Sequence, residues 1–129
     1  MIVSLHVATG AAGGALTRSR AGAAALGLVL HALGDVMPHH DIESRDFEIG
    51  SGVACALVLA ARHGLFSPIT IGALAASAPD LEHVVDLPGE RKLFPSHRIP
   101  GWHREGGVPA WAQLLAAGTI LGVLLARRG

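Results

Sequence analysis

The chain has 129 residues, eight of them histidines, and equal numbers of acidic and basic side chains give it a formal net charge of zero. Half of the residues are hydrophobic and only 16% are charged, which is below the roughly one quarter that is usual for soluble domains. This length predicts one helical domain over residues 1–129 with a core of its own, and the neutral balance argues against a nucleic-acid partner.

Five apolar segments follow one another along the chain, and each is rich in Ala, Leu and Gly. Because β-branched residues rarely alternate with polar ones in them, these segments predict helices rather than strands. The third contains the single cysteine, Cys55, which we expect in the core and which excludes an intramolecular disulfide. No basic side chain lies between Met1 and His6, which argues against a cleaved signal peptide. The helices are expected over about residues 3–16, 21–37, 50–62, 68–79 and 108–126.

A long polar stretch, residues 80–107, separates the fourth segment from the fifth and contains three prolines and four glycines. This composition predicts a functional loop with a short helical turn. The other connections are short, and short connections make neighbouring helices antiparallel. The fold class expected is therefore all-α: an antiparallel bundle of about five helices with a long polar loop between the fourth and fifth.

This topology separates the polar residues between the two ends of the bundle. One end would receive all ten carboxylates and seven of the eight histidines. The opposite end would receive His63 and five arginines, and no acidic residue. Such a segregation predicts one polar site at one pole of an apolar bundle.

The fifth segment contains about nineteen mostly apolar residues, which is long enough to span a bilayer. Gly10 with Gly14, and Gly118 with Gly122, form small-xxx-small patterns that allow close helix contact, including contact between copies of the chain in a homo-oligomer. These features favour insertion into a membrane or tight association with its lipids. The alternative is a compact soluble bundle in the cytoplasm.

The densest group of metal-binding side chains runs from His31 to Asp41. His31 and Asp35 are four residues apart, so a helix places them on one face, one turn apart. His39, His40 and Asp41 follow in a turn close to the helix end. A helix C-terminus favours histidines on its own, but it disfavours the negative charge of Asp35. Metal binding explains the whole run better, because imidazoles and carboxylates are the ligands of hydrolytic zinc sites.

A second group follows the fourth segment, where Asp80 and His83 are three residues apart and share a face if the helix continues past Pro79. The alternative is a solvated helix end that also includes Glu82. Near the start of the chain, His6 is placed by the topology at the same pole, either as a ligand or as a satisfied core residue.

A third group lies in the long loop, where His97 and His103 could fold over the site. Arg98 and Arg104, beside them in the sequence, could grip an anionic oxygen such as that of a phosphate. The alternative for this group is a polar surface loop.

The first two groups resemble motifs of a known family. The spacing from His31 to Asp35 and the segment from Gly72 to His83 resemble the HxxxD and GallPDiDH helices of the membrane-associated metal-dependent hydrolases, also called inner-membrane LexA-binding hydrolases. That family is distantly similar to zinc-dependent phospholipase C and the S1/P1 nucleases, all-helical enzymes that cleave phosphoesters with a zinc cluster. The resemblance implies a bacterial inner-membrane location and, as metal ligands, His31, Asp35, Asp80 and His83. The chain lacks the His-Arg-Gly-x-Thr-His-Ser segment that is common in the family.

These observations predict a metal-dependent hydrolase that acts on a small-molecule or lipid phosphoester. One or more Zn²⁺ ions, or Mn²⁺ or Fe²⁺, would activate a bound water and polarise the scissile group. Asp41 or Glu82 is the predicted general base, and Arg98 or Arg104 the predicted stabiliser of transition-state charge. Supplementary ligands, or groups that orient the ligands, are expected among His6, His39, His40, His97 and His103.

Two other functions remain open at this point. One is a non-catalytic membrane bundle whose polar pole binds or carries a metal ion. The other is a structural bundle whose histidines respond to pH. A catalytic site should leave an open position that faces a pocket, whereas a structural metal site is closed.

Overall fold

The computed structural model describes residues 1–85, 92–102, 104 and 106–127, and within them the chain is helical, without a β-strand. The five long helices correspond to the five predicted, and the two short ones fall within or next to the predicted polar loop. This confirms the expected all-α bundle. The elements are α1 (Val3–Leu16), α2 (Arg20–Val36), α3 (Arg45–His63), α4 (Pro68–Ser77), η1 (Ala78–His83), α5 (Pro95–Arg98) and α6 (Ala110–Ala126).

Serine side chains cap the starts of three helices. The hydroxyl oxygens of Ser19, Ser44 and Ser67 accept hydrogen bonds from backbone N–H groups in the first turns of α2, α3 and α4. In α3, Asp46 and Glu48 also lie in the first turn, where their negative charge is favourable. This helix therefore begins at Arg45, ahead of the apolar residues near position 50 that predicted it.

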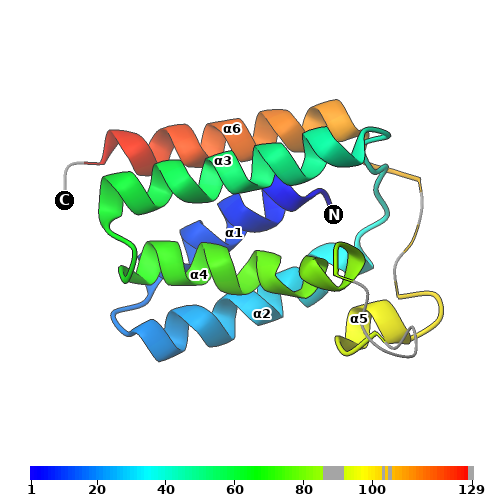
Figure 1. Ribbon diagram of the computed structural model, residues 1–129, viewed down its shortest axis with the longest axis horizontal. Helices are drawn as coiled ribbons and strands as arrows, with labels where there is room; N and C mark the ends of the chain where they lie inside the picture. The colour runs from blue at the N-terminus through cyan, green and yellow to red at the C-terminus, as the bar shows by residue number, and fades with distance from the viewer. Residues whose placement is uncertain (86–91, 103, 105, 128–129) are drawn as a thin grey trace.

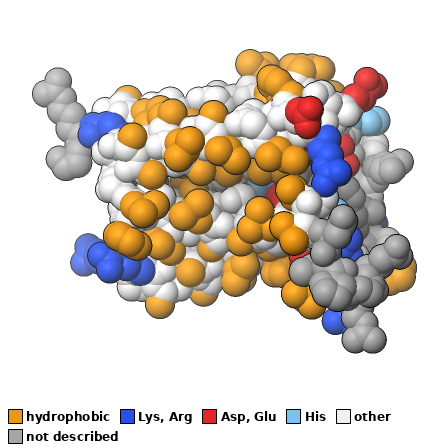
Figure 2. Space-filling model, viewed as in Figure 1, with side chains coloured by type: hydrophobic (Ala, Val, Ile, Leu, Met, Phe, Trp, Pro, Cys, Tyr) orange, Lys and Arg blue, Asp and Glu red, His pale blue; other side chains and the backbone are white. Residues whose placement is uncertain are grey.

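Figure 1 shows that the helices alternate in direction between two ends of the molecule. α1, α3 and α6 start at the end where α5 lies, and α2 and α4 run toward it. We call this end the polar end. On the face drawn in Figure 2, basic side chains lie at both ends, whereas the acidic side chains of the described residues lie only near the polar end, as the sequence predicted.

α1 is the central helix and packs against α2, α3, α4 and α6. Its approach to α4 depends on glycines, because a methyl group on Gly10 would overlap the carbonyl oxygen of Gly72, and one on Gly14 would overlap that of Pro68. The close contact predicted for this pair is therefore present. Gly118 and Gly122 on α6, by contrast, face open space among the described residues.

The core consists of small and medium-sized apolar side chains. One cluster joins Val7 of α1 to Leu59 of α3 and Leu124 of α6, and Cys55 packs against it while only partly buried. α6 has 17 residues, and none of the described helices combines the length and the apolar character needed to cross a membrane. The expectation that the fifth helix is long enough to span a bilayer is therefore wrong for the described residues.

Candidate metal centre

The carboxylate of Asp35, near the end of α2, lies at the centre of a buried cluster at the polar end. Only 3% of its side chain is exposed. Its Oδ1 atom lies 3.1 Å from the Nε2 atom of His6 and accepts a hydrogen bond from the Met1 amine, also at 3.1 Å. Its Oδ2 atom lies 3.0 Å from the Nε2 atom of His31, one helical turn earlier. The predicted pairing of His31 with Asp35 is therefore present, and α1 adds His6 to it.

The ring of His31 is fixed from the opposite side by α4. Its Nδ1 atom lies 2.8 Å from the carbonyl oxygen of Ala76, and a carbonyl can only accept, so Nδ1 carries a hydrogen. The Nε2 atom therefore points at Asp35, and it also lies 3.3 Å from the Nε2 atom of His97. A neutral imidazole in this tautomer directs its lone pair at those groups, where it can accept a hydrogen bond from His97 or bind a cation.

The short helix α5 completes the cluster from the long loop. The hydroxyl of Ser96 donates to Asp35 Oδ2 at 2.7 Å, and the Nε2 atom of His97 lies 3.4 Å from the same oxygen. His97 Nε2 also lies 3.9 Å from Oδ1 of Asp80, which η1 contributes. Residues from α1, α2, η1 and α5 thus meet around one carboxylate, although they are far apart in the sequence.

Asp80 has an unsatisfied oxygen at this site. Its Oδ2 atom is buried and has no hydrogen-bond partner among the described residues. Burial raises the pKa of Asp80 to about 6, and the carboxylate of Asp35 raises it further while the nearby His31 opposes the shift. A buried carboxylate oxygen without a donor fits a site for a cation.

The spacing of these side chains fits a metal ion. There are two sets of three residues, and in each set the ligand atoms all lie within 4.8 Å of one another. His31 belongs to both sets. Around an ion with bonds of about 2.1 Å, neighbouring ligand atoms lie about 3.0 to 3.4 Å apart in octahedral or tetrahedral geometry. The distances from His31 Nε2 to Asp35 and to His97, 3.0 and 3.3 Å, agree with this spacing. The first set is His6, His31 and Asp35, and the second is His31, Asp80 and His97.

The protonation of the first set also suits a cation. Burial lowers the pKa of His6 to about 3, so this imidazole is neutral at physiological pH, and its ring stacks on that of His31 with centroids 4.1 Å apart. Burial by itself would raise the pKa of Asp35, but hydrogen bonds with His31, His6, His97 and Ser96 outweigh it and hold the pKa well below its usual range. The set therefore offers the neutral imidazole of His6 and the ionised carboxylate of Asp35, the forms that bind a metal.

His83 lies beside the cluster rather than in either set. Its ring lies 4.4 Å from that of His97, centroid to centroid, and its Nδ1 atom lies 3.3 Å from the Lys92 ammonium. Burial lowers the pKa of His83 to about 4, and electrostatic interactions with His97 and Lys92 act in the same direction. The family resemblance implied His83 as a ligand, but His83 belongs to neither set, whereas its neighbour His97 belongs to the second.

His39, His40 and Asp41 belong to neither of the two ligand sets. The Nδ1 atom of His39 lies 2.6 Å from the Met37 carbonyl oxygen, and its Nε2 atom lies 3.2 Å from Asp41. Backbone hydrogen bonds pair this segment with residues 104–108, including an isolated bridge between His39 and Val108. His40 is exposed. The turn after α2 therefore serves to join two loops, although Asp41 still lines the cavity described below.

The remaining predicted residues have other surroundings. The carboxylate of Glu82 accepts hydrogen bonds from the backbone N–H groups of Leu93 and Phe94, which ties η1 to the segment before α5. Arg98 and Arg104 are exposed and do not line the cavity at the cluster. His103 lies outside the described residues.

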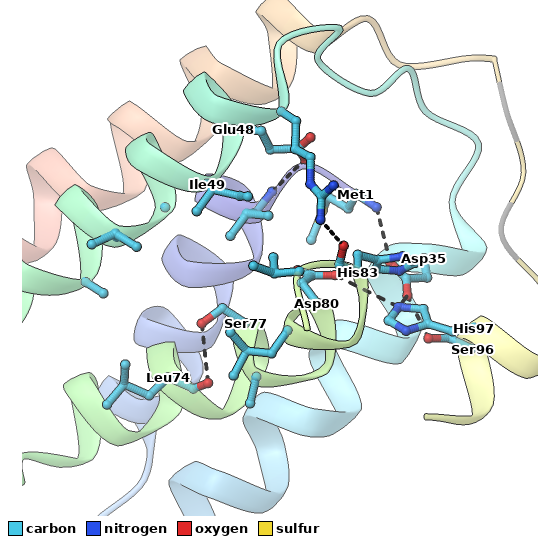
Figure 3. A pocket seen from close by; sticks show the side chains of 18 of the residues that line it. Met1, Asp35, Glu48, Ile49, Leu74, Ser77, Asp80, His83, Ser96 and His97 are labelled. Carbon is cyan, nitrogen blue, oxygen red and sulfur yellow. Dashed lines mark hydrogen bonds and ion pairs between the residues drawn. The ribbon is translucent and has the colours of Figure 1, made fainter. Parts of the chain in front are cut away.

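A cavity of about 750 Å³ opens from the cluster toward solvent. Figure 3 shows Asp35, Asp80, His83 and His97 at one end of it, with Ile49 and Leu74 farther along α3 and α4. The guanidinium of Arg45 reaches the same end and donates to the carbonyl oxygen of His83. Sequence reasoning missed both Arg45 and Ser96, since neither belongs to a metal-binding residue type or to a spacing motif.

Comparisons with family models, with curated proteins and with solved structures give no match. The resemblance of the two helical motifs to the membrane-associated hydrolases therefore stays a prediction. What supports a metal site is the arrangement of His6, His31, Asp35, Asp80 and His97.

Proposed function

We propose that this protein is a metal-dependent hydrolase that cleaves a phosphoester at the cluster around Asp35. The observation that carries the proposal is the position of His31, whose Nδ1–H group donates to Ala76 while Nε2 points at Asp35 and His97. Metal-binding histidines almost always donate their other ring N–H to a carbonyl or carboxylate, which fixes the tautomer and the direction of the free nitrogen.

The residues around the cluster have distinct tasks in this proposal. His6, His31, Asp35, Asp80 and His97 supply the ligand atoms, a mixed imidazole and carboxylate set that suits Zn²⁺ and also Mn²⁺ or Fe²⁺. When bound, such an ion supplies a Lewis acid and lowers the pKa of a coordinated water. Ser96 holds the Asp35 carboxylate in place from α5.

Two residues that line the cavity would act on the substrate. Asp41 keeps the general-base role, since Glu82 is engaged by two backbone N–H groups. Arg45 takes the role expected of Arg98 or Arg104, because its guanidinium lines the cavity next to the cluster and can contact an anionic oxygen.

The second candidate function is a bundle that binds or carries a metal ion without catalysis. The open cavity next to Asp80 and His97 favours the hydrolase, because a structural metal site is closed by its own ligands. An assay for hydrolysis of a model phosphoester separates the two functions, because only the hydrolase would cleave it.

The test combines metal analysis with hydrolysis. Metal-free protein is dialysed against Zn²⁺, Mn²⁺ or Fe²⁺, its bound metal is measured by mass spectrometry, and it is then assayed with p-nitrophenyl phosphate and bis(p-nitrophenyl) phosphate. We expect stoichiometric metal and phosphoester cleavage in the wild type. In His97→Ala and Asp80→Asn we expect loss of cleavage and metal binding that is weaker by tenfold or more. His63→Ala is the matched control, because His63 lies at the far end of α3. A wild type without stoichiometric metal contradicts both functions, and metal without cleavage of either ester supports the carrier.

A further inference from the structure

The cavity continues from the metal-binding cluster as a groove between α3 and α4. Along α3, its wall is formed by Ile49, Val53, Leu57 and Ala60, which recur every three or four residues and so share one face of the helix. Leu74 lines the groove from α4. The charged and histidine side chains lie at one end only, where η1 and α5 meet the start of α3 (Figure 3).

Large apolar side chains in this groove are exposed to solvent. The exposed fractions are 64% for Leu57, 53% for Val53 and 41% for Leu74. They remain exposed because α4 packs mainly against α1 and α2 and only lightly against α3. Figure 2 shows rows of hydrophobic side chains along α3 and α4 on either side of this hollow. A contiguous apolar surface of this kind marks a site for a ligand or partner.

We infer that the groove binds an aliphatic chain of the substrate, so that the substrate is an amphiphile with an anionic ester headgroup. The headgroup would lie at the cluster near Arg45, and the chain would extend between α3 and α4. This inference rests on the proposed function, which supplies the reason for a headgroup at Asp35.

The shape and polarity of the cavity favour this occupant. Its charged and histidine side chains are confined to the end beside Asp35, Asp80 and His97, and most of the remaining wall is apolar, which matches a molecule with one charged end and one apolar tail. A basic group, Arg45, lies at the polar end and complements an anionic headgroup. A flat protein or bilayer surface would not enter a concave groove that ends at buried ligands.

The length of the groove sets an expected chain length. Ile49 and Ala60 are eleven residues apart on α3, which corresponds to about 17 Å at a rise of roughly 1.5 Å per residue. Carbon–carbon bonds of about 1.5 Å advance an extended chain by about 1.3 Å per methylene, so the groove holds roughly a dozen carbon atoms.

The test measures the binding of n-alkylphosphonates, whose C–P bond is not an ester and is not hydrolysed at such a site. Compounds from butyl to tetradecyl are titrated calorimetrically into zinc-loaded protein, below their micelle-forming concentrations. Burial of one methylene contributes about 0.8 kcal/mol, so the dissociation constant should fall by up to about fourfold for each added carbon. We expect this gain to stop near a dozen carbons. A dissociation constant that does not change with chain length overturns the inference.

A pair of variants locates the chain. Ala60→Phe fills the far end of the groove and should weaken binding of the longest alkylphosphonates by tenfold or more, while leaving the butyl compound unchanged. Ala61→Phe, on the next residue, lies outside the groove and should behave as the wild type. Leu57→Ser is a second, less bulky change at an exposed position and should weaken long chains several-fold. Equal effects of Ala60→Phe and Ala61→Phe overturn the inference.

Other occupants give other results. If the protein sediments as a dimer and binds no alkylphosphonate, a second copy covers the groove and the inference is wrong. Binding to phosphatidylcholine vesicles without binding of monomeric alkylphosphonates likewise assigns the groove to a bilayer and overturns it. Failure of the proposed function is recognised separately, by the absence of stoichiometric metal. If the protein binds metal but its dissociation constant for alkylphosphonates does not change with chain length, only the inference about the groove is wrong.

Discussion

The Nδ1 atom of His31 lies 2.8 Å from the carbonyl oxygen of Ala76, so the backbone of α4 sets the orientation of an imidazole on α2. The two residues are 45 positions apart. This contact makes α2 and α4 a single support for the cluster, and it gives His31 a structural task in addition to the proposed metal binding.

Replacement of the two central histidines should therefore separate stability from metal binding. His31→Ala removes a fully buried ring and leaves the Ala76 carbonyl without its donor, which should destabilise the metal-free protein by about 2 to 4 kcal/mol. His97 lies on the short helix α5, so His97→Ala should lower the free energy of unfolding of the metal-free protein by less than about 1.5 kcal/mol. It should still lower the metal affinity by tenfold or more. Urea denaturation in EDTA and zinc titration measure the two effects. Equal loss of stability in both variants would contradict this assignment.

Metal binding should stabilise the folded protein. At a free metal concentration one hundred times the dissociation constant, the expected gain is about 2.7 kcal/mol. For a domain of this size, that gain should raise the melting temperature by roughly 10 °C. Thermal denaturation with Zn²⁺ and with EDTA measures the shift, which should be small in Asp80→Asn and unchanged in His63→Ala. A shift of equal size in all three proteins would indicate binding elsewhere.

The stability of the metal-free protein should depend on pH through His6. Its pKa falls to about 3 on folding because of burial, so between pH 3 and its ordinary pKa of 6.5 the unfolded state binds more protons than the folded state. Stability therefore rises with pH, by about 1.4 kcal/mol per pH unit across this range, and is lost as the pH falls from 6.5.

Asp80 acts in the opposite direction over part of that range. Its pKa rises from 3.8 to about 6 because of burial, so between these values the folded state binds more protons and stability falls as the pH rises. Asp80→Asn should therefore steepen the pH dependence between pH 4 and 6. Urea denaturation in EDTA at several pH values measures both slopes, and an unchanged slope in this variant would contradict the raised pKa.

Two glycine substitutions should have opposite effects. Gly10→Ala places a methyl group on the backbone of α4 at Gly72, which cannot move without separating the central helices, and should destabilise the protein by about 1 to 3 kcal/mol. Gly118→Ala meets open space on α6 and should stabilise it by about 0.5 to 1 kcal/mol through helix propensity. Thermal and urea denaturation measure the difference, and a stabilising Gly10→Ala would rule out the close approach of α1 and α4.

Helix periodicity and topology predicted most of the fold. The spacing of His31 and Asp35 predicted their contact, and the alternation of helix direction predicted that His6 and Asp80 lie at the same end. The start of α3 was predicted late, because it depends on the Ser44 cap and on acidic residues of the first turn rather than on apolar periodicity.

The turn and loop residues were harder to predict. His39 and His40 follow Asp35 closely, but backbone hydrogen bonds pair their segment with Arg104, Gly106 and Val108, and neither histidine joins a ligand set. No local spacing reveals such a long-range pairing. Ser96 reaches the cluster from α5, and Glu82 binds the backbone just before that helix, which is again a contact between distant segments.

His31 belongs to both ligand sets, yet it has a single nitrogen to offer, because its other nitrogen is committed to Ala76. One lone pair can bind one ion. In the proposed site, an ion held with His6 and Asp35 and an ion held with Asp80 and His97 would therefore compete for His31, and one metal would have two alternative positions. A cation could move between them by exchanging partners while this imidazole stays bound.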